Sequence, residues 1–299
     1  MPTKKVIISL FVFSLMFRAT AAELKSGEYF ITQTWSQESN YKRTYHVNVP
    51  DNAGTKPLPV FIFLHGNGGN AQGAMRGFLR PNKPMQERFI MIFPQGYQRS
   101  WNIVSERSNA DDLAYIESII ETVSSYSNVQ KDNFSIMGSS NGAALVNQIA
   151  IETKLACIKN YVSAVSPLNT YQHDGKHFKS KGKDNNYTEI TAPLTRKRLM
   201  NISGTKDQLI PYAGGHSKGI RAKNGKLPFV AAEESTFLWA KHMGYKGERL
   251  AEPTTVDGNI ETFSYLNGDV VHCKVINAAH NAGRAIKEDV LLKFLTGGR

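Results

Sequence analysis

The sequence predicts an α/β fold, in which helices cover both faces of a mostly parallel, twisted sheet. Strand-like and helix-like segments alternate along the chain, and this alternation is typical of parallel sheets. Residues 59–64 and 89–93 are almost uninterrupted apolar runs of strand length. Such runs are expected for strands that are buried on both faces.

The other elements are expected in a regular order. An antiparallel pair at residues 29–33 and 43–49 precedes the two buried strands. Between residues 110 and 126 apolar residues recur at helical spacing, and Asp111 and Asp112 favour the first turn. The remaining segments are strands at 134–137, 161–165, 199–203, 261–265 and 270–276, and helices at 143–151, 233–243 and 284–295.

The first 22 residues have the composition of a secretory signal peptide. Lys4 and Lys5 precede an apolar run at 6–17, and the small residues at 19–22 provide a cleavage site. The run is short for a bilayer core of about 30 Å. We therefore expect cleavage and a secreted or periplasmic chain without a membrane span, with a retained N-terminal anchor as the alternative. No linker divides residues 23–299, which predicts a single catalytic domain.

Residues 169–196 interrupt the alternation, because they are polar, rich in lysine and without clear periodicity. A connection of this length within a compact domain is usually functional or mobile. We interpret it as a polar insertion over the carboxyl edge of the sheet. It is either a partial lid or a solvated loop without a role in substrate binding.

Composition and charge exclude some classes of function for this protein. The chain has 299 residues, of which 41% are hydrophobic and 20% charged, as in ordinary globular proteins. Its net charge is +11, and removal of Lys4, Lys5 and Arg18 with the signal peptide leaves +8. This surplus favours approach to anionic surfaces such as acidic polysaccharide or a bacterial envelope. The basic residues are scattered without a nucleic-acid recognition signature, so no nucleic-acid partner is expected. Cys157 and Cys273 are too few for a disulfide framework or zinc cluster, but they leave one bridge open.

The sequence Gly-Ser-Ser-Asn-Gly at 138–142 fits the pattern G-x-S-x-G, with Ser140 at the nucleophile position. A predicted strand precedes it and a predicted helix follows it, which is the setting of the nucleophile elbow in the α/β-hydrolase fold. The alternative is a glycine-rich turn with an ordinary serine. A hydroxyl is a poor nucleophile at neutral pH, so Ser140 needs a base within hydrogen-bond reach.

In the α/β-hydrolase fold an acid and then a histidine follow the serine along the chain. His280 lies in a loop of small residues after the last predicted strand, where the base is expected, whereas His272 falls inside that strand. Asp207 follows the strand at 199–203 and can orient the imidazole. Asp257 and Asp269 are alternatives for the acid, although each lies in or near a predicted hairpin.

An oxyanion hole is expected beside the nucleophile. One amide should come from the residue after it, Asn141, and the other from the loop after an early strand. His-Gly-Asn-Gly-Gly at 65–69 provides that loop, with Asn67 as first candidate and Gly66 as second. His65 precedes the serine and is expected to brace the loop.

Together these pieces resemble the polyhydroxybutyrate depolymerase and feruloyl/acetylxylan esterase group of α/β-hydrolases. The resemblance implies that Asp207 and His280 complete a triad, that Trp101 and Asn102 lie near the substrate, and that Asp111 and Asp112 are scaffold residues. It runs from about residue 42 to the end, and its matching blocks are 58–69, 93–96, 100–102, 109–113, 138–143 and 204–215.

The activity that the resemblance implies is hydrolysis of carboxylic esters through an acyl-enzyme, without a metal or cofactor. The expected substrates are polyhydroxyalkanoate-type oligomers or polymers, or acyl esters of plant polysaccharides. The group often has an aromatic-proline stretch after its histidine, where this chain has Asn-Ala-Gly at 281–283. Short-chain and oligomeric esters are therefore equally compatible. A serine peptidase and a non-catalytic binding protein on the same scaffold remain alternatives.

Overall fold

The computed structural model describes the chain except for residues 1–20, 52–55, 105–107, 183–184, 224 and 299. The predicted signal peptide, residues 1–22, thus falls almost entirely outside the described residues. Within the described part, no helix is both long enough and apolar enough to cross a membrane.

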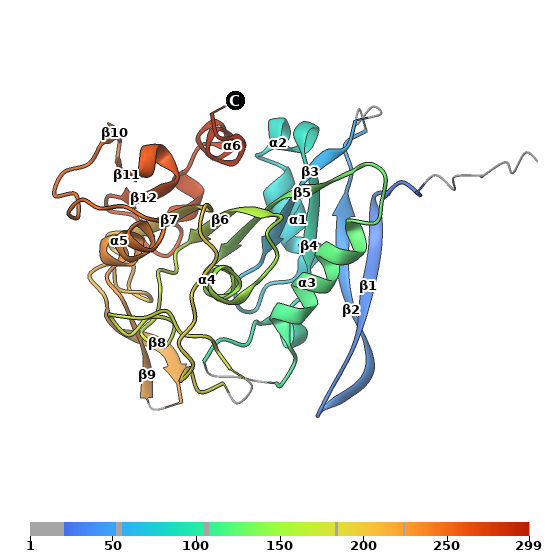
Figure 1. Cartoon of the computed structure of the whole chain (residues 1–299), viewed down its shortest axis with the longest axis horizontal. Coiled ribbons are helices and arrows are strands. Elements are labelled where there is room, and N and C mark those ends of the chain that lie inside the picture. The colour runs from blue at the N-terminus through green and yellow to red at the C-terminus, as the bar shows by residue number, and fades with distance from the viewer. Residues whose placement is uncertain (1–20, 52–55, 105–107, 183–184, 224, 299) are drawn as a thin grey trace, which may run out of the picture.

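A twisted sheet forms the centre of the molecule (Figure 1). Among the described residues ten strands form it, in the order β1-β2-β4-β3-β5-β6-β7-β12-β11-β10. The strands from β4 to β12 in this order are parallel, and antiparallel strands complete both edges. Their bounds are β1 Gly27–Trp35, β2 Glu38–Asn48, β3 Leu58–Leu64, β4 Ile90–Pro94, β5 Val129–Ser139, β6 Ile158–Ala164, β7 Arg198–Gly204, β10 Thr255–Asp257, β11 Ile260–Tyr265 and β12 Val270–Val275.

Helices cover both faces of this sheet (Figure 1). The helices α3, α4 and α5 contribute buried side chains to one apolar core, and α1, α2 and α6 contribute them to the other. Their bounds are α1 Ala71–Leu79, α2 Lys83–Arg88, α3 Asp112–Val123, α4 Asn141–Glu152, α5 Ala232–His242 and α6 Glu288–Thr296.

Strand β3 shows why the central strands lack a polar face. Val60, Ile62 and Leu64 belong to the core under α3 and α4, whereas Phe61 belongs to the core under α1 and α6. Successive side chains of a strand point to opposite faces, so a strand covered on both sides is apolar throughout. The prediction of a mostly parallel sheet between two layers of helices is confirmed.

Several elements differ from the sequence expectation. The last helix begins at Glu288, not at residue 284, because residues 282–285 form a short 3₁₀ turn. Helices α1 and α2 and a separate hairpin of β8 (Gly215–Ala222) and β9 (Gly225–Phe229) were not expected. Helix α1 contains two glycines, which are poor helix formers.

The insertion at 169–196 is mostly irregular, but buried contacts anchor it. The Gln172 side-chain amide donates to the Ala144 carbonyl at 2.9 Å, and the Tyr187 hydroxyl donates to the Ile103 carbonyl at 2.6 Å. The segment is thus tied to helix α4 and to the loop before α3, while Lys176 is exposed. Its role as a lid stays a prediction.

The bridge that the sequence left open between the two cysteines is not formed. Both thiols are free, with Cys157 half-buried and Cys273 buried on β12. Burial raises the pKa of the Cys273 thiol to about 12.

A buried ion pair joins the antiparallel edge of the sheet to α3. The Arg43 guanidinium, from β2, lies 2.6 Å from Asp112 Oδ1 and stacks 3.8 Å from the centre of the Tyr115 ring. The other oxygen of Asp112 accepts from the backbone amide of Asn102 at 2.7 Å. Asp111, one residue earlier, caps α3 by accepting from the Ala114 amide at 2.9 Å. Both aspartates therefore support the scaffold, as the sequence predicts.

We expect Asp112→Ala to lower the free energy of unfolding by about 3–5 kcal/mol, because it leaves a buried guanidinium without its partner. Asp111→Ala is the matched control and removes only a helix cap, which costs about 1 kcal/mol. Urea denaturation of both variants measures the difference. Equal losses in the two variants would show that the ion pair does not hold this edge together.

Candidate active site

Ser140 stands on a tight turn between β5, which ends at Ser139, and α4, which begins at Asn141. Its φ of 55° and ψ of −116° lie in a region that side-chain-bearing residues rarely adopt. A Cβ on Gly138 would overlap the backbone of Gly142, and a Cβ on Gly142 would overlap the backbone at the end of β3. Only glycine therefore allows the helix to approach the strands this closely, which holds the serine in its strained conformation.

Three side chains from distant parts of the chain meet at this turn. The Nε2 atom of His280 lies 2.8 Å from the Ser140 hydroxyl oxygen. The Nδ1 atom of the same ring lies 2.7 Å from Asp207 Oδ2. The Asp207 side chain is 3% exposed and the His280 side chain 29%, so the carboxylate is enclosed while the imidazole reaches solvent. The structure thus brings the three residues into one hydrogen-bonded row.

Two loops position the acid and the base relative to each other. The second carboxylate oxygen of Asp207, Oδ1, accepts hydrogen bonds from the backbone amides of Leu209 and Ile210 at 2.8 and 2.9 Å. At the end of β7, a Cβ on Gly204 would overlap the carbonyl groups of residues 278 and 279. Glycine at 204 thus lets the loop that carries His280 lie directly on the loop that carries Asp207. Nothing in the sequence around residue 204 predicts this contact.

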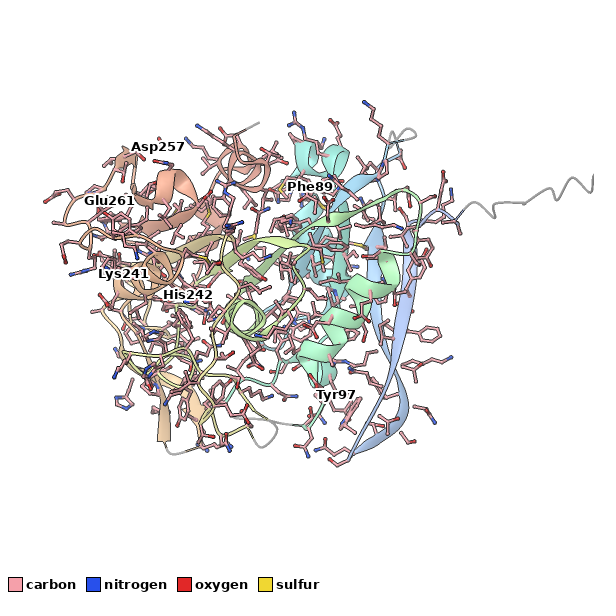
Figure 2. The ribbon with its side chains drawn as sticks, in the orientation of Figure 1. Phe89, Tyr97, Lys241, His242, Asp257 and Glu261 are labelled. Atoms are coloured by element: carbon pink, nitrogen blue, oxygen red, sulfur yellow. The ribbon has the colours of Figure 1, made fainter. Side chains whose placement is uncertain are left out.

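The alternative acids are placed elsewhere. Asp257 lies at the outer edge of the sheet and pairs with Lys287 at 2.8 Å (Figure 2). Asp269 pairs with Arg198 at 3.0 Å. Neither carboxylate is bonded to His280.

Two segments next to the serine, the loop after β3 and the start of α4, carry the candidate oxyanion amides. In the loop after β3, the amides of Gly68 and Gly69 donate to the carbonyls of Arg99 and Gly66 at 2.8 and 3.0 Å. Within the described part of the chain, the backbone amides of Gly66, Asn67 and Asn141 donate to no backbone carbonyl. These are the three amides that the sequence predicts for an oxyanion hole.

Ser100 joins these two segments. The sequence predicts no role for its side chain. Its hydroxyl lies 3.0 Å from Asn67 Oδ1 and 3.2 Å from Asn141 Oδ1. The Asn141 side chain also accepts from the Trp101 amide at 2.8 Å and donates to the Trp101 carbonyl at 2.9 Å. The loop at 96–101 therefore fixes the start of α4 against the loop after β3.

His65 braces the loop after β3, as predicted. Its Nδ1 lies 2.8 Å from the Gly66 carbonyl and therefore carries the proton, while Nε2 accepts from the Gly96 amide at 3.1 Å. Burial lowers the pKa of this imidazole, which keeps it neutral. Both ring nitrogens are thus engaged in holding the backbone.

Trp101 and Asn102, which are expected near the substrate, occupy buried positions beside the loops of the site. Trp101 is 2% exposed, and its ring NH donates to the His65 carbonyl at 2.8 Å. Asn102 is 5% exposed, and its side-chain amide donates to Ser108 and to the Ala110 carbonyl at 3.0 and 2.9 Å. Both side chains therefore stabilise loops next to the site through buried hydrogen bonds.

His272 belongs to a separate buried network next to the loop that carries Asp207. Its ring lies 2.8 Å from the Tyr212 hydroxyl and 3.1 Å from Asn201 Oδ1. Tyr212 also donates to Glu233 at 2.8 Å. Complete burial lowers the pKa of the His272 imidazole to about 3. This histidine is a structural residue of β12 and has no contact with Ser140.

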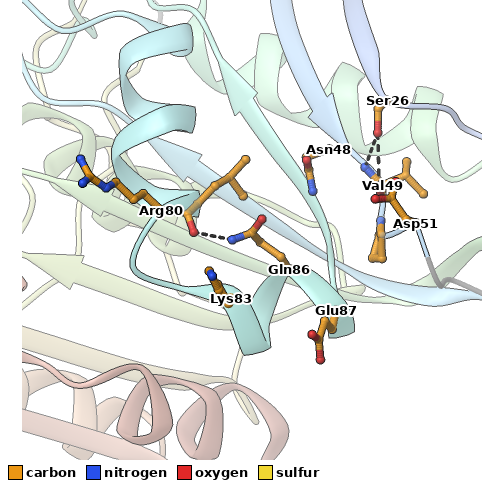
Figure 3. Close-up of a pocket in the computed structure, with 10 residues that line it drawn as sticks. Ser26, Asn48, Val49, Asp51, Arg80, Lys83, Gln86 and Glu87 are labelled. Carbon is orange, nitrogen blue, oxygen red and sulfur yellow. Dashed lines mark hydrogen bonds between the residues drawn. The ribbon is translucent and has the colours of Figure 1, made fainter.

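Among the clefts on the surface of the described residues, two bear on the location of the site. The larger, about 1020 Å³, lies between α1 and α6 and reaches Gly66 and His280. The smaller, about 590 Å³, lies between the end of β2 and α2 and contains no triad residue (Figure 3). No described residue of the 169–196 insertion lines either cleft. In the described part of the chain, no group of three or more acidic, histidine or cysteine side chains could hold a metal ion.

Comparisons with known proteins agree with this architecture. The chain is 23% identical over 236 residues to feruloyl esterase B of Piromyces equi, an alignment that covers 77% of this chain and 41% of the esterase. It is 28% identical over 123 residues to feruloyl esterase B of Neurospora crassa, over 39% of this chain and 41% of that protein. The chain therefore spans less than half the length of these relatives. No protein-family model matches it.

Solved structures show the same fold. The acetyl xylan esterase from Aspergillus awamori superposes with a TM-score of 0.61 at 16% identity, over 90% of this chain and 99% of that one. S-formylglutathione hydrolase from Staphylococcus aureus superposes with a TM-score of 0.51 at 13% identity, over 91% and 99% of the two chains. The chain has the α/β-hydrolase fold. The sequence similarities to feruloyl esterase B also support the predicted resemblance to the feruloyl and acetylxylan esterase group.

We expect the free energy of unfolding to decrease as pH falls from about 6.5 towards 3, because His272 is neutral when folded and protonates when unfolded. His272→Gln removes this titration, so the curve of unfolding free energy against pH becomes shallower by up to about 1.4 kcal/mol per pH unit. Urea denaturation at intervals across that range provides the measurement. An unchanged slope in the variant would mean that His272 is already protonated in the fold.

Proposed function

We propose that this protein is a serine carboxylic-ester hydrolase that acts through an acyl-enzyme. The observation that carries the proposal is the hydrogen-bonded row of Ser140, His280 and Asp207 beside unpaired backbone amides. This arrangement combines a nucleophile, a base and a site for negative charge, which are the requirements of acyl transfer.

The protons of the row follow from its geometry. Asp207 Oδ2 can only accept when ionised, so the His280 proton lies on Nδ1, and Nε2 is free to accept the serine proton. As Ser140 attacks the ester carbonyl, the imidazole becomes charged beside the buried carboxylate, which stabilises it without taking the proton. His280 then donates this proton to the departing alcohol. A water molecule enters at the exposed ring and releases the acid by the same sequence.

The negative charge of the tetrahedral intermediate develops on the carbonyl oxygen. We propose that the amide of Asn141 and an amide of the loop after β3, Asn67 or Gly66, donate to it. The start of α4 adds the positive end of the helix dipole. The bonds of Ser100 to both segments keep these donors in place before substrate binds, and one such donor contributes about 3 kcal/mol to the transition state.

The proposed natural substrates are acyl esters of plant polysaccharides or oligomers of hydroxyalkanoates. The first class is supported by sequence similarity to feruloyl esterase B and structural similarity to an acetyl xylan esterase. The second rests on the motifs shared with polyhydroxybutyrate depolymerases. We further propose export after signal-peptide cleavage, to the periplasm or outside the cell. A net charge of +8, which remains after loss of Lys4, Lys5 and Arg18, would attract the enzyme to acidic polysaccharide or envelope surfaces.

We expect Ser140→Ala to lower kcat for p-nitrophenyl acetate by about 10⁵- to 10⁶-fold, because no other group in the row can attack the carbonyl. Asp207→Asn should lower it by about 10⁴-fold, since it favours the wrong imidazole tautomer. Steady-state hydrolysis measures both effects. Undiminished turnover in Ser140→Ala would remove this residue from the mechanism.

A serine-directed phosphonate provides the matched control. It should label Ser140 in the wild-type protein and in Ser139→Ala, but not in Ser140→Ala, as located by peptide mass spectrometry. A binding protein on this scaffold would show neither labelling nor turnover, and a peptidase would prefer amide to ester substrates. Acetylated xylan, methyl ferulate and hydroxybutyrate oligomers then separate the natural substrate classes.

A further inference from the structure

The larger cleft has an open face on α1 that the packing of the domain does not explain. Asn70, Gly73, Ala74 and Gly77 line it at the spacing of one helix face. A Cβ on Gly77 would meet no atom within 4 Å, and Gly77 is exposed. Glycine inside a helix costs about 0.5–1 kcal/mol relative to alanine. The chain therefore keeps this face empty at the expense of helix stability.

The floor of the cleft is apolar and leads away from the site. Phe63, Met137, Val165 and Ile202, near the carboxyl ends of β3, β5, β6 and β7, form the floor. Val165 has a φ of 52°, which is unfavourable for a β-branched residue. The wall along α1 runs from the loop after β3 to the end of the helix, a length of about 14 Å at 1.5 Å per residue. This floor suits an aliphatic chain.

The rim of the cleft is basic. Arg80, at the end of α1, and Arg284, after the loop of His280, are exposed side chains on opposite walls. No ion pair engages either guanidinium within the described residues. The other charged groups are already engaged, since Lys287 pairs with Asp257 and Glu288 accepts from the Met85 amide at 2.8 Å.

We infer that this cleft binds the acyl arm of the ester, and that the preferred acyl group is an extended aliphatic chain ending in a carboxylate. The inference rests on the proposed esterase function. The cleft is continuous with the site, because Gly66 and His280 form part of its wall. The acyl group stays attached to Ser140 while the alcohol leaves and water enters at the exposed face of His280. An apolar-floored cleft therefore suits the arm that is retained, and the guanidinium groups attract its carboxylate.

The test compares p-nitrophenyl monoesters of suberic acid and octanoic acid, which have acyl chains of equal length and differ in the terminal charge. Wild-type kcat/KM should be about five-fold higher for the suberoyl ester, which is typical of an exposed ion pair. Arg284→Ala and Arg80→Ala should each reduce this preference. Arg76→Ala, on the same helix as Arg80 but outside the cleft, should preserve it.

Filling the cleft tests the path of the chain. Gly77→Leu should lower the ratio of suberoyl to acetyl kcat/KM at least about ten-fold, because the new side chain occupies the space of the acyl arm. Gln72→Leu adds the same side chain to an exposed position of α1 outside the cleft and should leave that ratio unchanged. An unchanged ratio in Gly77→Leu overturns the inference. The inference is also overturned if the enzyme prefers a charged substrate only when the carboxylate is on the alcohol arm of the ester and not on the acyl arm.

A binding measurement separates this inference from the proposed function. Calorimetric titration with suberate and octanoate should show tighter binding of suberate to the wild-type protein, and weaker binding of suberate to Arg284→Ala and Gly77→Leu. If no ester is hydrolysed but suberate binds in this pattern, the esterase proposal fails and the cleft remains a binding site for the dicarboxylate. If acetate esters are hydrolysed and suberate does not bind preferentially, the assignment of the cleft fails alone.

Discussion

The close packing of helix α4 against the ends of β3 and β5 is the constraint on which the site depends. Gly138 and Gly142 permit it, because any side chain at either position would overlap backbone atoms. The approach forces Ser140 into a strained conformation with positive φ and places the start of α4 beside the loop after β3. The nucleophile and the proposed oxyanion donors thus arise from a single backbone contact.

Buried hydrogen bonds from several parts of the domain stabilise the loops around this strained turn. His65, Trp101 and Asn141 tie three loops together through hydrogen bonds to backbone groups. Asp112 extends the support to the edge of the sheet, because it binds both the Asn102 amide and Arg43. A backbone conformation that costs a few kcal/mol persists only when its surroundings fix it in this way. The residues behind the site are therefore as closely specified as those that line it.

The sequence predicted the elements that depend on local pattern. Uninterrupted apolar runs identified β3 and β4, because strands buried on both faces have no polar face. The chain order of serine, acid and histidine located the three residues that meet at the turn. Helix α1 was missed because its glycines lower helix propensity, and they line a cleft that exists only in three dimensions. The burial of Trp101 and Asn102 could not be predicted, since a side chain near a site has the same sequence pattern whether it faces the substrate or the core.

The contacts between distant loops also lay beyond the sequence. Gly204 reads as an ordinary glycine after a strand, and its role follows only from the approach of the loop that carries His280. Ser100 lies in the matching block at 100–102, but its two bonds depend on the spatial meeting of the loop after β3 with α4. Local pattern thus located the reactive groups, whereas the geometry that aligns them required the fold.

Rapid-mixing kinetics with p-nitrophenyl acetate test the proposed acyl-enzyme most directly. If Ser140 is acylated before water releases the acid, and release is slower than acylation, p-nitrophenol should appear in a burst of about one equivalent per enzyme molecule. The acetylated intermediate should then be trapped by acid quenching and found on Ser140 by mass spectrometry. Turnover with no acyl group on Ser140 at any quench time would contradict the account.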